Sequence, residues 1–195
     1  MSILSITAQK PNSTGSGIYL TELVKEYGCK GHAQAVVAGV YREDTVELPE
    51  GVRFYPVYFE EGKLPFPIVG MSDEMPYRST RYCDMTPKMT AQFEEAFLES
   101  ITQAVREFGP DLILCHHLYL LTAVVRKHFP EYRVYGFCHN TDLRQMCKTD
   151  LEREFIREQI RKLDRIFVPQ KAQREGVLAV YQAKPEKIEA VGMGY

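Results

Sequence analysis

The chain has 195 residues, of which 45% are hydrophobic, and it carries a formal net charge of -2 at pH 7 with a pI near 6.2. This length and apolar content are sufficient for one globular domain with a full core. The nearly balanced charge gives no argument for a strongly basic nucleic-acid-binding surface, although a local basic patch stays open, and we expect no nucleic-acid partner.

The first segments in chain order predict an α/β unit. Residues 2–8 are expected to form a strand, residues 10–17 a turn-rich loop and residues 18–27 a helix. Two further strands are predicted within 32–41 and 52–59, where valine and aromatic residues are frequent.

Residues 60–87 show no regular hydrophobic pattern, because four prolines are scattered among aromatic and charged residues. Connections of this length are often lids or binding loops. Next, Thr86 and Pro87 match a helix N-cap and a first helical position, and an apolar stripe runs to Phe108. Gly109-Pro110 predicts the end of this helix.

The second half of the chain continues to alternate between strands and helices. A capping box at 149–152 is expected to start a helix on which Leu151, Phe155, Ile160 and Leu163 share one face. The other expected elements are strands at 111–115, 133–138, 165–169 and 187–191, and helices at 118–129 and 172–181. This alternation predicts an α/β fold with a Rossmann-like, mainly parallel sheet flanked by helices on both faces.

The N-terminus lacks a secretory signal, and no stretch reaches the roughly 18 apolar residues of a membrane helix. We therefore expect a cytoplasmic protein without a transmembrane segment. The five cysteines include no Cys-x-x-Cys pair, which favours reduced, mostly buried thiols over disulfides.

The strongest candidate site follows the apolar strand that ends near residue 138, where His139, Asp142 and Arg144 lie close together in sequence. Ligands of open α/β sheets collect at the carboxyl ends of the strands. His139 is the candidate functional imidazole, and the alternative is a buried histidine bonded to a backbone carbonyl. Asp142 could orient His139 or hold a substrate hydroxyl, and Arg144 could bind phosphate or carboxylate. The alternatives for these two are a helix cap and a solvated surface charge.

The loop that contains Gly15, Ser16 and Gly17 is a second candidate site. Glycine lets backbone N–H groups approach a phosphate or a sugar, and the N-terminus of the following helix favours negative charge. The alternative is a tight strand-to-helix turn, because the spacing matches neither dinucleotide-binding glycines nor a Walker motif.

Cys115, His116, His117, Cys138 and His139 are residue types that bind zinc, but their spacing argues against a metal site. Successive strand side chains point to opposite faces, so His116 is expected to face away from Cys115 and His117. We therefore predict no metal.

Four segments, in order, resemble the N-terminal domain of the retaining glycosyltransferases of GT-B fold, the family of glycogen and sucrose synthases. The loop at 13–17 resembles the family's glycine loop, and residues 110–117 resemble its "PDvihvHh" strand. Residues 137–142 resemble its "H.tD" strand end, and residues 164–169 its "aD.iiv.S" strand. This sequence departs from the family at Asn140, where relatives often have glycine, and at Gln170, where they often have serine.

The resemblance implies that the intact enzyme transfers a sugar from a nucleotide-sugar donor with retained anomeric configuration and without a cofactor or an essential metal. Gly15 and Gly17 would approach the donor diphosphate or the acceptor. His139 would lie beside the donor sugar, and His116 and Asp142 would line the acceptor side. The acceptor could be a sugar, a lipid-linked compound or a small molecule. Two roles are open for the aromatic residues of the irregular segment: they could form an apolar wall of the acceptor site, or they could pack in the core. These residues are Tyr58, Phe59, Phe66 and Tyr77.

Residues 190–195 resemble the strand and hinge through which the family's chain enters a second, nucleotide-sugar-binding domain. We therefore expect residues 1–195 to be a single Rossmann-like domain, the N-terminal half of a glycosyltransferase, that is inactive alone. Two alternatives are a nucleotide-sugar epimerase of the same fold and a non-catalytic module that binds a sugar or a nucleotide.

Overall fold

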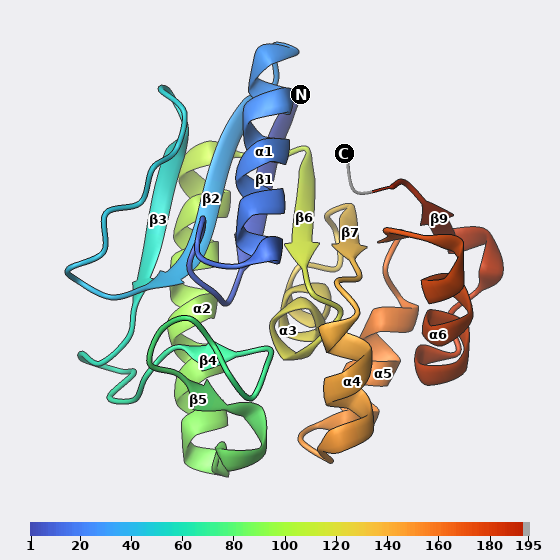
Figure 1. Ribbon diagram of the computed structural model, residues 1–195. Helices are drawn as coiled ribbons and strands as arrows, with labels where there is room; N and C mark the ends of the chain where they lie inside the picture. Colours follow the sequence, from blue (N-terminus) through green and yellow to red (C-terminus); the bar gives the residue numbers. More distant parts are fainter. Residues whose placement is uncertain (193–195) are drawn as a thin grey trace.

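The computed structural model describes residues 1–192, which form a seven-stranded sheet in the order β3-β2-β1-β6-β7-β8-β9. Every pairing in this sheet is parallel (Figure 1). Its strands are β1 (Ser2–Thr7), β2 (Ala33–Val40), β3 (Arg53–Tyr58), β6 (Leu112–His116), β7 (Val134–Phe137), β8 (Arg165–Val168) and β9 (Ile188–Ala190). The predicted α/β, Rossmann-like fold is confirmed. Of the predicted hinge at 190–195, residues 193–195 lie outside the described residues.

Helices cover the two faces of the sheet unequally. The α-helices are α1 (Gly15–Cys29), α2 (Pro87–Phe108), α3 (Leu120–His128), α4 (Thr141–Lys148), α5 (Arg153–Arg161) and α6 (Lys171–Tyr181). Helices α2, α3 and α6 share the main core on one face, whereas α1 packs on the opposite face over β1 and β2 (Figure 1). Helices therefore flank both faces of the sheet, as predicted, and within residues 1–192 α1 is the only helix on that second face.

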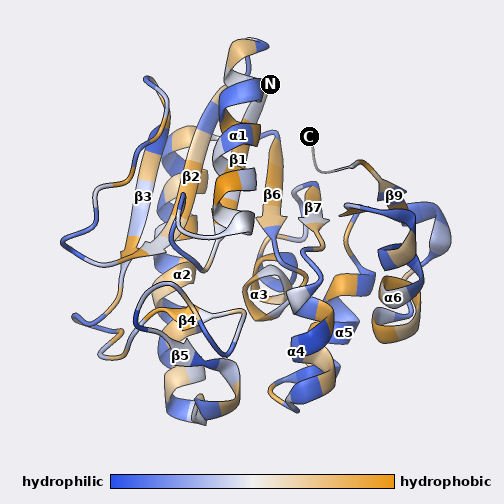
Figure 2. Cartoon of the chain, in the orientation of Figure 1, coloured by the Kyte–Doolittle hydropathy of each residue, from blue (hydrophilic) through white to orange (hydrophobic). Residues whose placement is uncertain are grey.

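The central strands have continuous apolar sequences because both of their faces are buried, as is typical of parallel sheets. Five of the six residues of β1 and all residues of β6 are buried. Hydrophobic residues accordingly concentrate in β1, β2 and β6, while α4 is mostly hydrophilic (Figure 2). Helix α4 lies at the carboxyl edge of the sheet, where one side meets solvent.

The helix predicted from Thr86 to Phe108 is confirmed with its caps. Oγ1 of Thr86 accepts a hydrogen bond of 3.2 Å from the amide of Met89, and Pro87 is the first helical residue. Gly109 adopts φ 63°, the left-handed conformation that glycine accepts without strain, and ends the helix.

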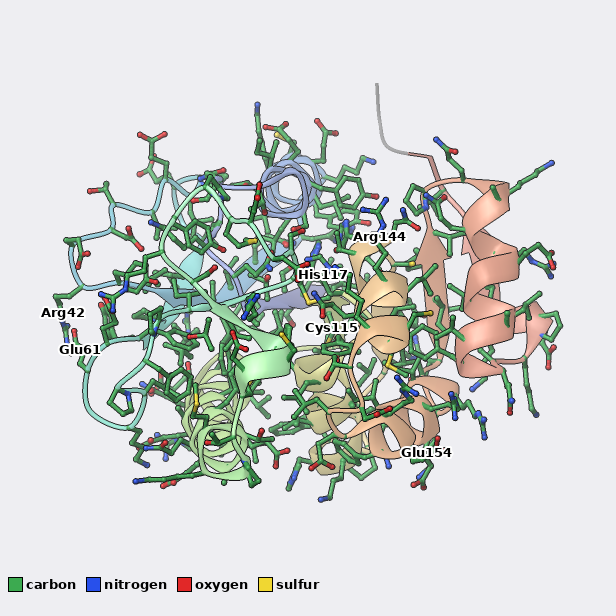
Figure 3. The ribbon with its side chains drawn as sticks, turned by 60° about the horizontal axis from the view of Figure 1, so that its bottom comes forward. Arg42, Glu61, Cys115, His117, Arg144 and Glu154 are labelled. Carbon is green, nitrogen blue, oxygen red and sulfur yellow. The ribbon has the colours of Figure 1, made fainter. Side chains whose placement is uncertain are left out.

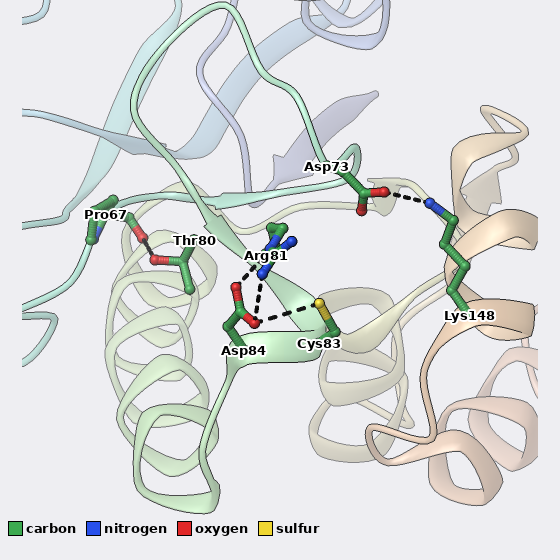
Figure 4. Close-up of polar contacts among 7 residues, drawn as sticks. All are labelled: Pro67, Asp73, Thr80, Arg81, Cys83, Asp84 and Lys148. Atoms are coloured by element: carbon green, nitrogen blue, oxygen red, sulfur yellow. Dashed lines mark hydrogen bonds and ion pairs between the residues drawn. The ribbon is translucent and has the colours of Figure 1, made fainter.

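The segment between β3 and α2 is packed rather than loose. It contains the two-stranded sheet of β4 (Val69–Gly70) and β5 (Thr80–Arg81) and the 3₁₀ helix η1 (Tyr82–Asp84). Oγ1 of Thr80 donates to the carbonyl of Pro67 over 2.8 Å, and Nζ of Lys148 on α4 lies 2.5 Å from a carboxylate oxygen of Asp73 (Figure 4). The segment is therefore tied to its own base and to α4.

The aromatic residues Phe59 and Phe66 in and before this segment are buried in the main core, with ring centroids 6.0 Å apart. They are packing residues. Tyr58 and Tyr77 are partly exposed, so a role in a binding wall stays a prediction for these two.

Two helical predictions in the second half need correction. Helix α5 begins at Arg153 rather than at the capping box, because Glu152 adopts φ 45° and Oγ1 of Thr149 accepts from the amide of Leu151. Leu151 and Leu163 therefore lie just outside this helix. Helix α4 was not predicted from the sequence. A second 3₁₀ helix, η2 (Pro185–Lys187), precedes β9.

The cysteines are all free, but the expectation that most are buried is wrong, because Cys29, Cys83 and Cys147 are exposed. Only Cys115 and Cys138 are buried. None of the helices in residues 1–192 combines the length and apolar character needed to span a bilayer.

Candidate functional site

The candidate site lies at the carboxyl ends of three neighbouring strands. β1 pairs with β6, and β6 pairs with β7, so the segments that follow these strands meet at one edge of the sheet. They supply the loop before α1, the pair His116-His117 and the segment from Cys138 to α4. Figure 3 views this edge end-on, with Cys115 and His117 near its centre. The residues that the sequence analysis selected therefore lie at the same edge of the sheet.

His116, His117 and His139 contact one another, and we call them the histidine cluster. Nδ1 of His116 lies 3.2 Å from Nε2 of His139, and the two rings are nearly parallel, at 16°, with centroids 5.4 Å apart. The His117 and His139 rings are 4.7 Å apart. Because β6 ends at His116 and His117 adopts φ 70°, His117 turns back toward His139. The expectation that His116 and His117 point apart is therefore wrong, since strand alternation stops at His116.

The histidine cluster is neutral at pH 7. Burial lowers the pKa of His139 to about 4 and lowers the pKa of His116 and His117 well below 6.5, with the neighbouring imidazoles adding to the effect in His116 and His117. Neutral imidazole offers one donor and one acceptor. These residues therefore act as hydrogen-bonding groups rather than as cations.

The glycine loop reaches the histidine cluster through Ser16. Oγ of Ser16 lies 3.0 Å from Nε2 of His117 and donates to Oε1 of Gln9 over 3.4 Å. Thr14 is the N-cap of α1, and its Oγ1 accepts from the amide of Gly17 over 3.2 Å. The residues of the two candidate sites predicted from sequence therefore lie in contact and are treated as one candidate site.

The two glycines of the loop have different surroundings. A Cβ on Gly17 would lie 2.7 Å from the carbonyl oxygen of Lys10, closer than real Cβ contacts. Gly15 is exposed, and a Cβ there would meet nothing within 4 Å. Gly17 therefore keeps the loop packed against α1, while Gly15 is the glycine open to a ligand.

Asp142 is fully buried and holds the backbone around the histidine cluster. Its carboxylate accepts from the amides of Leu118 at 2.8 Å, Leu143 at 3.1 Å and His139 at 3.2 Å, and Sγ of Cys138 lies 3.4 Å away. Burial raises the pKa of Asp142, although these donors act in the opposite direction. The family resemblance implied that Asp142 lines the acceptor side. In the structure its carboxylate oxygens face these donors and not an open cleft. His116, 3% exposed, is likewise enclosed.

Arg144 stands apart from the histidine cluster. It is exposed on α4, and its guanidinium makes no hydrogen bond or ion pair with any residue in 1–192. Figure 3 shows Arg144 on α4, to one side of His117. A charge held free at this edge is available to an anionic ligand.

The sequence reasoning missed Tyr19 on α1. Its ring lies edge-on to His116, Phe137 and His139, with centroids 6.3, 5.6 and 5.7 Å away. A groove of about 720 Å³ runs beside it; the lining includes Ile18, Leu23, Phe137, Phe167 and Val191. The helical spacing of Tyr19, Leu23 and Tyr27 was the available signal, because it marks the inner face of α1.

Among the described residues, no group of three or more His, Cys, Asp or Glu side chains is arranged so that it could hold a metal ion, and this includes the histidine cluster. The other two histidines, His32 and His128, lie outside the cluster, His32 partly exposed and His128 exposed.

The comparisons with known proteins agree with this architecture. Among solved structures, sucrose-phosphate synthase from Thermosynechococcus elongatus superposes with a TM-score of 0.69 at 14% identity, over 98% of this chain and 48% of that one. The catalytic domain of starch synthase IV from Arabidopsis thaliana gives 0.59 at 15% identity, over 98% and 51%. UDP-GlcNAc 2-epimerase from Neisseria meningitidis gives 0.56 at 10% identity, over 98% and 47%.

The chain thus spans about half the length of these similar structures, and its fold is that of a GT-B N-terminal domain. No curated protein matches the sequence. The family model described as Glycosyltransferase Family 4 matches residues 13–195, which is most of the chain. The chain therefore belongs to glycosyltransferase family 4.

Proposed function

We propose that this chain is the acceptor-side domain of an enzyme that transfers a sugar from a nucleotide-sugar donor to an acceptor with retention of configuration. The observation that carries the proposal is the contact of the Ser16 loop with the histidine cluster at the carboxyl ends of β1, β6 and β7 in a family 4 chain. The donor binds mainly to a second domain, so this domain alone does not turn over. Similar structures about twice as long support this division.

His139 positions the donor sugar. It is the partly exposed member of the histidine cluster, and its low pKa keeps it neutral. A neutral imidazole held between His116 and His117 suits hydrogen bonding to a sugar hydroxyl rather than covalent attack. Departure of the diphosphate then depends on electrostatic stabilisation.

The first turn of α1 and Arg144 supply that stabilisation. The unpaired amides at the N-terminus of α1 favour an anion, and the exposed Gly15 leaves them accessible. Arg144 offers a free guanidinium on the adjoining helix. Ser16, bonded to His117, holds the loop against the histidine cluster. Asp142 and His116 contact His139 on the side away from the ligand: Asp142 accepts from its amide, and His116 is hydrogen-bonded to its ring.

A panel of nucleotide sugars tests this proposal on the full natural protein that contains residues 1–195. One donor is expected to raise the melting temperature and to give transfer or slow hydrolysis, with product configuration assigned by NMR. A ligand at a hundred times its dissociation constant stabilises by about 2.7 kcal/mol, which such a scan detects.

The variants His139→Ala and His128→Ala form a matched pair, because His128 is exposed and outside the site. His139→Ala should lower the transfer rate by about a hundredfold, a loss of roughly 2.7 kcal/mol of transition-state stabilisation, and His128→Ala should not. Equal rates would remove His139 from the site. Binding without turnover would favour a non-catalytic module, and turnover by residues 1–195 alone would refute the need for a second domain.

A further inference from the structure

His116 occupies the middle of a stack of rings that crosses the sheet. Phe167 on β8 packs on Phe137 on β7, and Phe137 stacks on His116 at 5.2 Å and 19°; the His139 ring lies nearly parallel to that of His116, at 16°, with centroids 5.4 Å apart. Tyr19 closes the edge of this stack. The His116 ring can therefore neither tilt nor slide without displacing its neighbours.

The two nitrogens of His116 have opposite surroundings. Nδ1 lies 3.2 Å from Nε2 of His139. Nε2 is buried and has no hydrogen-bond partner within residues 1–192. Since both imidazoles are neutral, one of the two facing nitrogens carries a proton and the other accepts it.

The unpartnered Nε2 of His116 decides which of the two facing nitrogens carries the proton. If His139 donated, His116 would keep its proton on Nε2 and bury an N–H group with no acceptor. If His116 donates from Nδ1, the unpartnered Nε2 carries only an in-plane acceptor lone pair, and no buried N–H donor is left unsatisfied. Orphaned buried N–H groups are the rarer and more costly case.

We infer that His116 is a positioning residue whose Nδ1–H donates to Nε2 of His139 and so fixes the proton of His139 on Nδ1. In the described residues Nδ1 of His139 has no protein partner. His139 therefore presents an N–H donor, and the ligand atom that it binds must be a hydrogen-bond acceptor such as a hydroxyl or phosphoryl oxygen. The catalytic consequence rests on the proposed function, but the assignment of the proton does not.

Long-range ¹H–¹⁵N NMR of histidine-labelled protein at pH 7.5 tests the assignment directly. In the wild type, His116 and His139 should both be protonated on Nδ1. His116→Phe keeps a stacked ring and removes the donor, so His139 should shift to a mixture of both tautomers. His116→Asn restores an N–H near the Nδ1 position and should restore the Nδ1–H form of His139. His128→Phe, at an exposed position, should change nothing.

A wild-type His139 protonated on Nε2 would overturn the inference, even if the Phe variant does not fold. So would an unchanged His139 tautomer in a folded His116→Phe protein. Neither reading needs turnover, so failure of the proposed function is recognised separately, by the nucleotide-sugar panel. In an active protein, His116→Phe should lower kcat by about tenfold, the worth of one hydrogen bond, with His116→Asn recovering most of it.

Discussion

Oγ of Ser16 lies 3.0 Å from Nε2 of His117, although 101 residues separate the two in sequence. The contact joins the first turn of α1 to the end of β6. It also gives the buried ring of His117 a partner on one side, while Oγ1 of Thr141 lies 3.5 Å from its Nδ1 on the other. Ser16 thus both fixes the position of the loop against the histidine cluster and provides a hydrogen-bond partner for His117.

Ser16→Ala should lower the free energy of unfolding by about 1–2 kcal/mol, because it leaves a buried ring nitrogen without its partner. Urea unfolding followed by circular dichroism measures the change. Ser79→Ala is the control, since the Ser79 hydroxyl has no hydrogen-bond partner among the described residues. Equal stability of both variants would mean that the Ser16–His117 contact is not maintained in solution.

Gly17→Ala and Gly15→Ala separate the two roles of the glycine loop. The added methyl at Gly17 meets the Lys10 carbonyl, and relieving that overlap should cost roughly 1–3 kcal/mol of stability. At Gly15 there is open space, so stability should stay unchanged or rise by up to about 1 kcal/mol. Thermal unfolding of the two variants gives the comparison. If Gly17→Ala unfolds at the same temperature as the wild type, the loop accommodates the added methyl group without loss of stability.

Stability should fall as the pH drops from 7.5 to 5.0. The folded-state pKa of His139 is lowered from 6.5 to about 4, so in this window the unfolded chain binds protons that the folded chain does not. Unfolding free energy therefore rises with pH between these two values, and His139 alone should account for about 2 kcal/mol at pH 5.0.

Asp142 opposes this trend in part, because its folded-state pKa is raised and its proton stabilises the folded state at low pH. Denaturation at the two pH values checks the net sign. His139→Gln should flatten the dependence, and His128→Gln should leave it as in the wild type. A stability that is higher at pH 5.0 would contradict neutral, buried imidazoles.

The segment between β3 and α2 depends on α4 through a buried hydrogen bond. Nε2 of Gln145 donates to the carbonyl of Met71 over 3.0 Å, whereas the Lys148–Asp73 ion pair is exposed. Gln145→Ala should therefore increase cleavage of the segment in limited proteolysis several-fold, and Lys148→Ala should have little effect. If both variants resist cleavage like the wild type, other contacts of the segment are sufficient.

The sequence was most informative where local chemistry alone decides the structure. The apolar strands and the capped helix α2 follow from patterns within a few residues, and each was predicted close to its observed position. Helix α4 was missed because it is short and polar and begins after Asn140, which adopts φ 66°. Its place depends on Asp142, whose carboxylate also accepts from the amides of Leu118 and His139, outside the helix.

The sequence led to two separate candidate sites but not to the contact between them. His139 and the glycine loop were both identified, yet the link between them depends on the left-handed turn at His117, which no sequence rule signals for a histidine. For Asp142 the sequence left open a role beside His139, a helix cap and a solvated surface charge. Its burial arises from the packing of the turns after β6 and β7, which only the fold reveals.

The strand order places β1 between β2 and β6, so a segment made first is flanked by one made more than a hundred residues later. During synthesis, β1 and β2 can pair early, but the histidine cluster contacts Ser16 only after β6 has paired with β1 across the connection that contains α2. Closing such a long connection is a slow step in folding. The candidate site is thus completed late, because Asp142, which holds the backbone around the histidine cluster, is not made until about 142 residues of the chain exist.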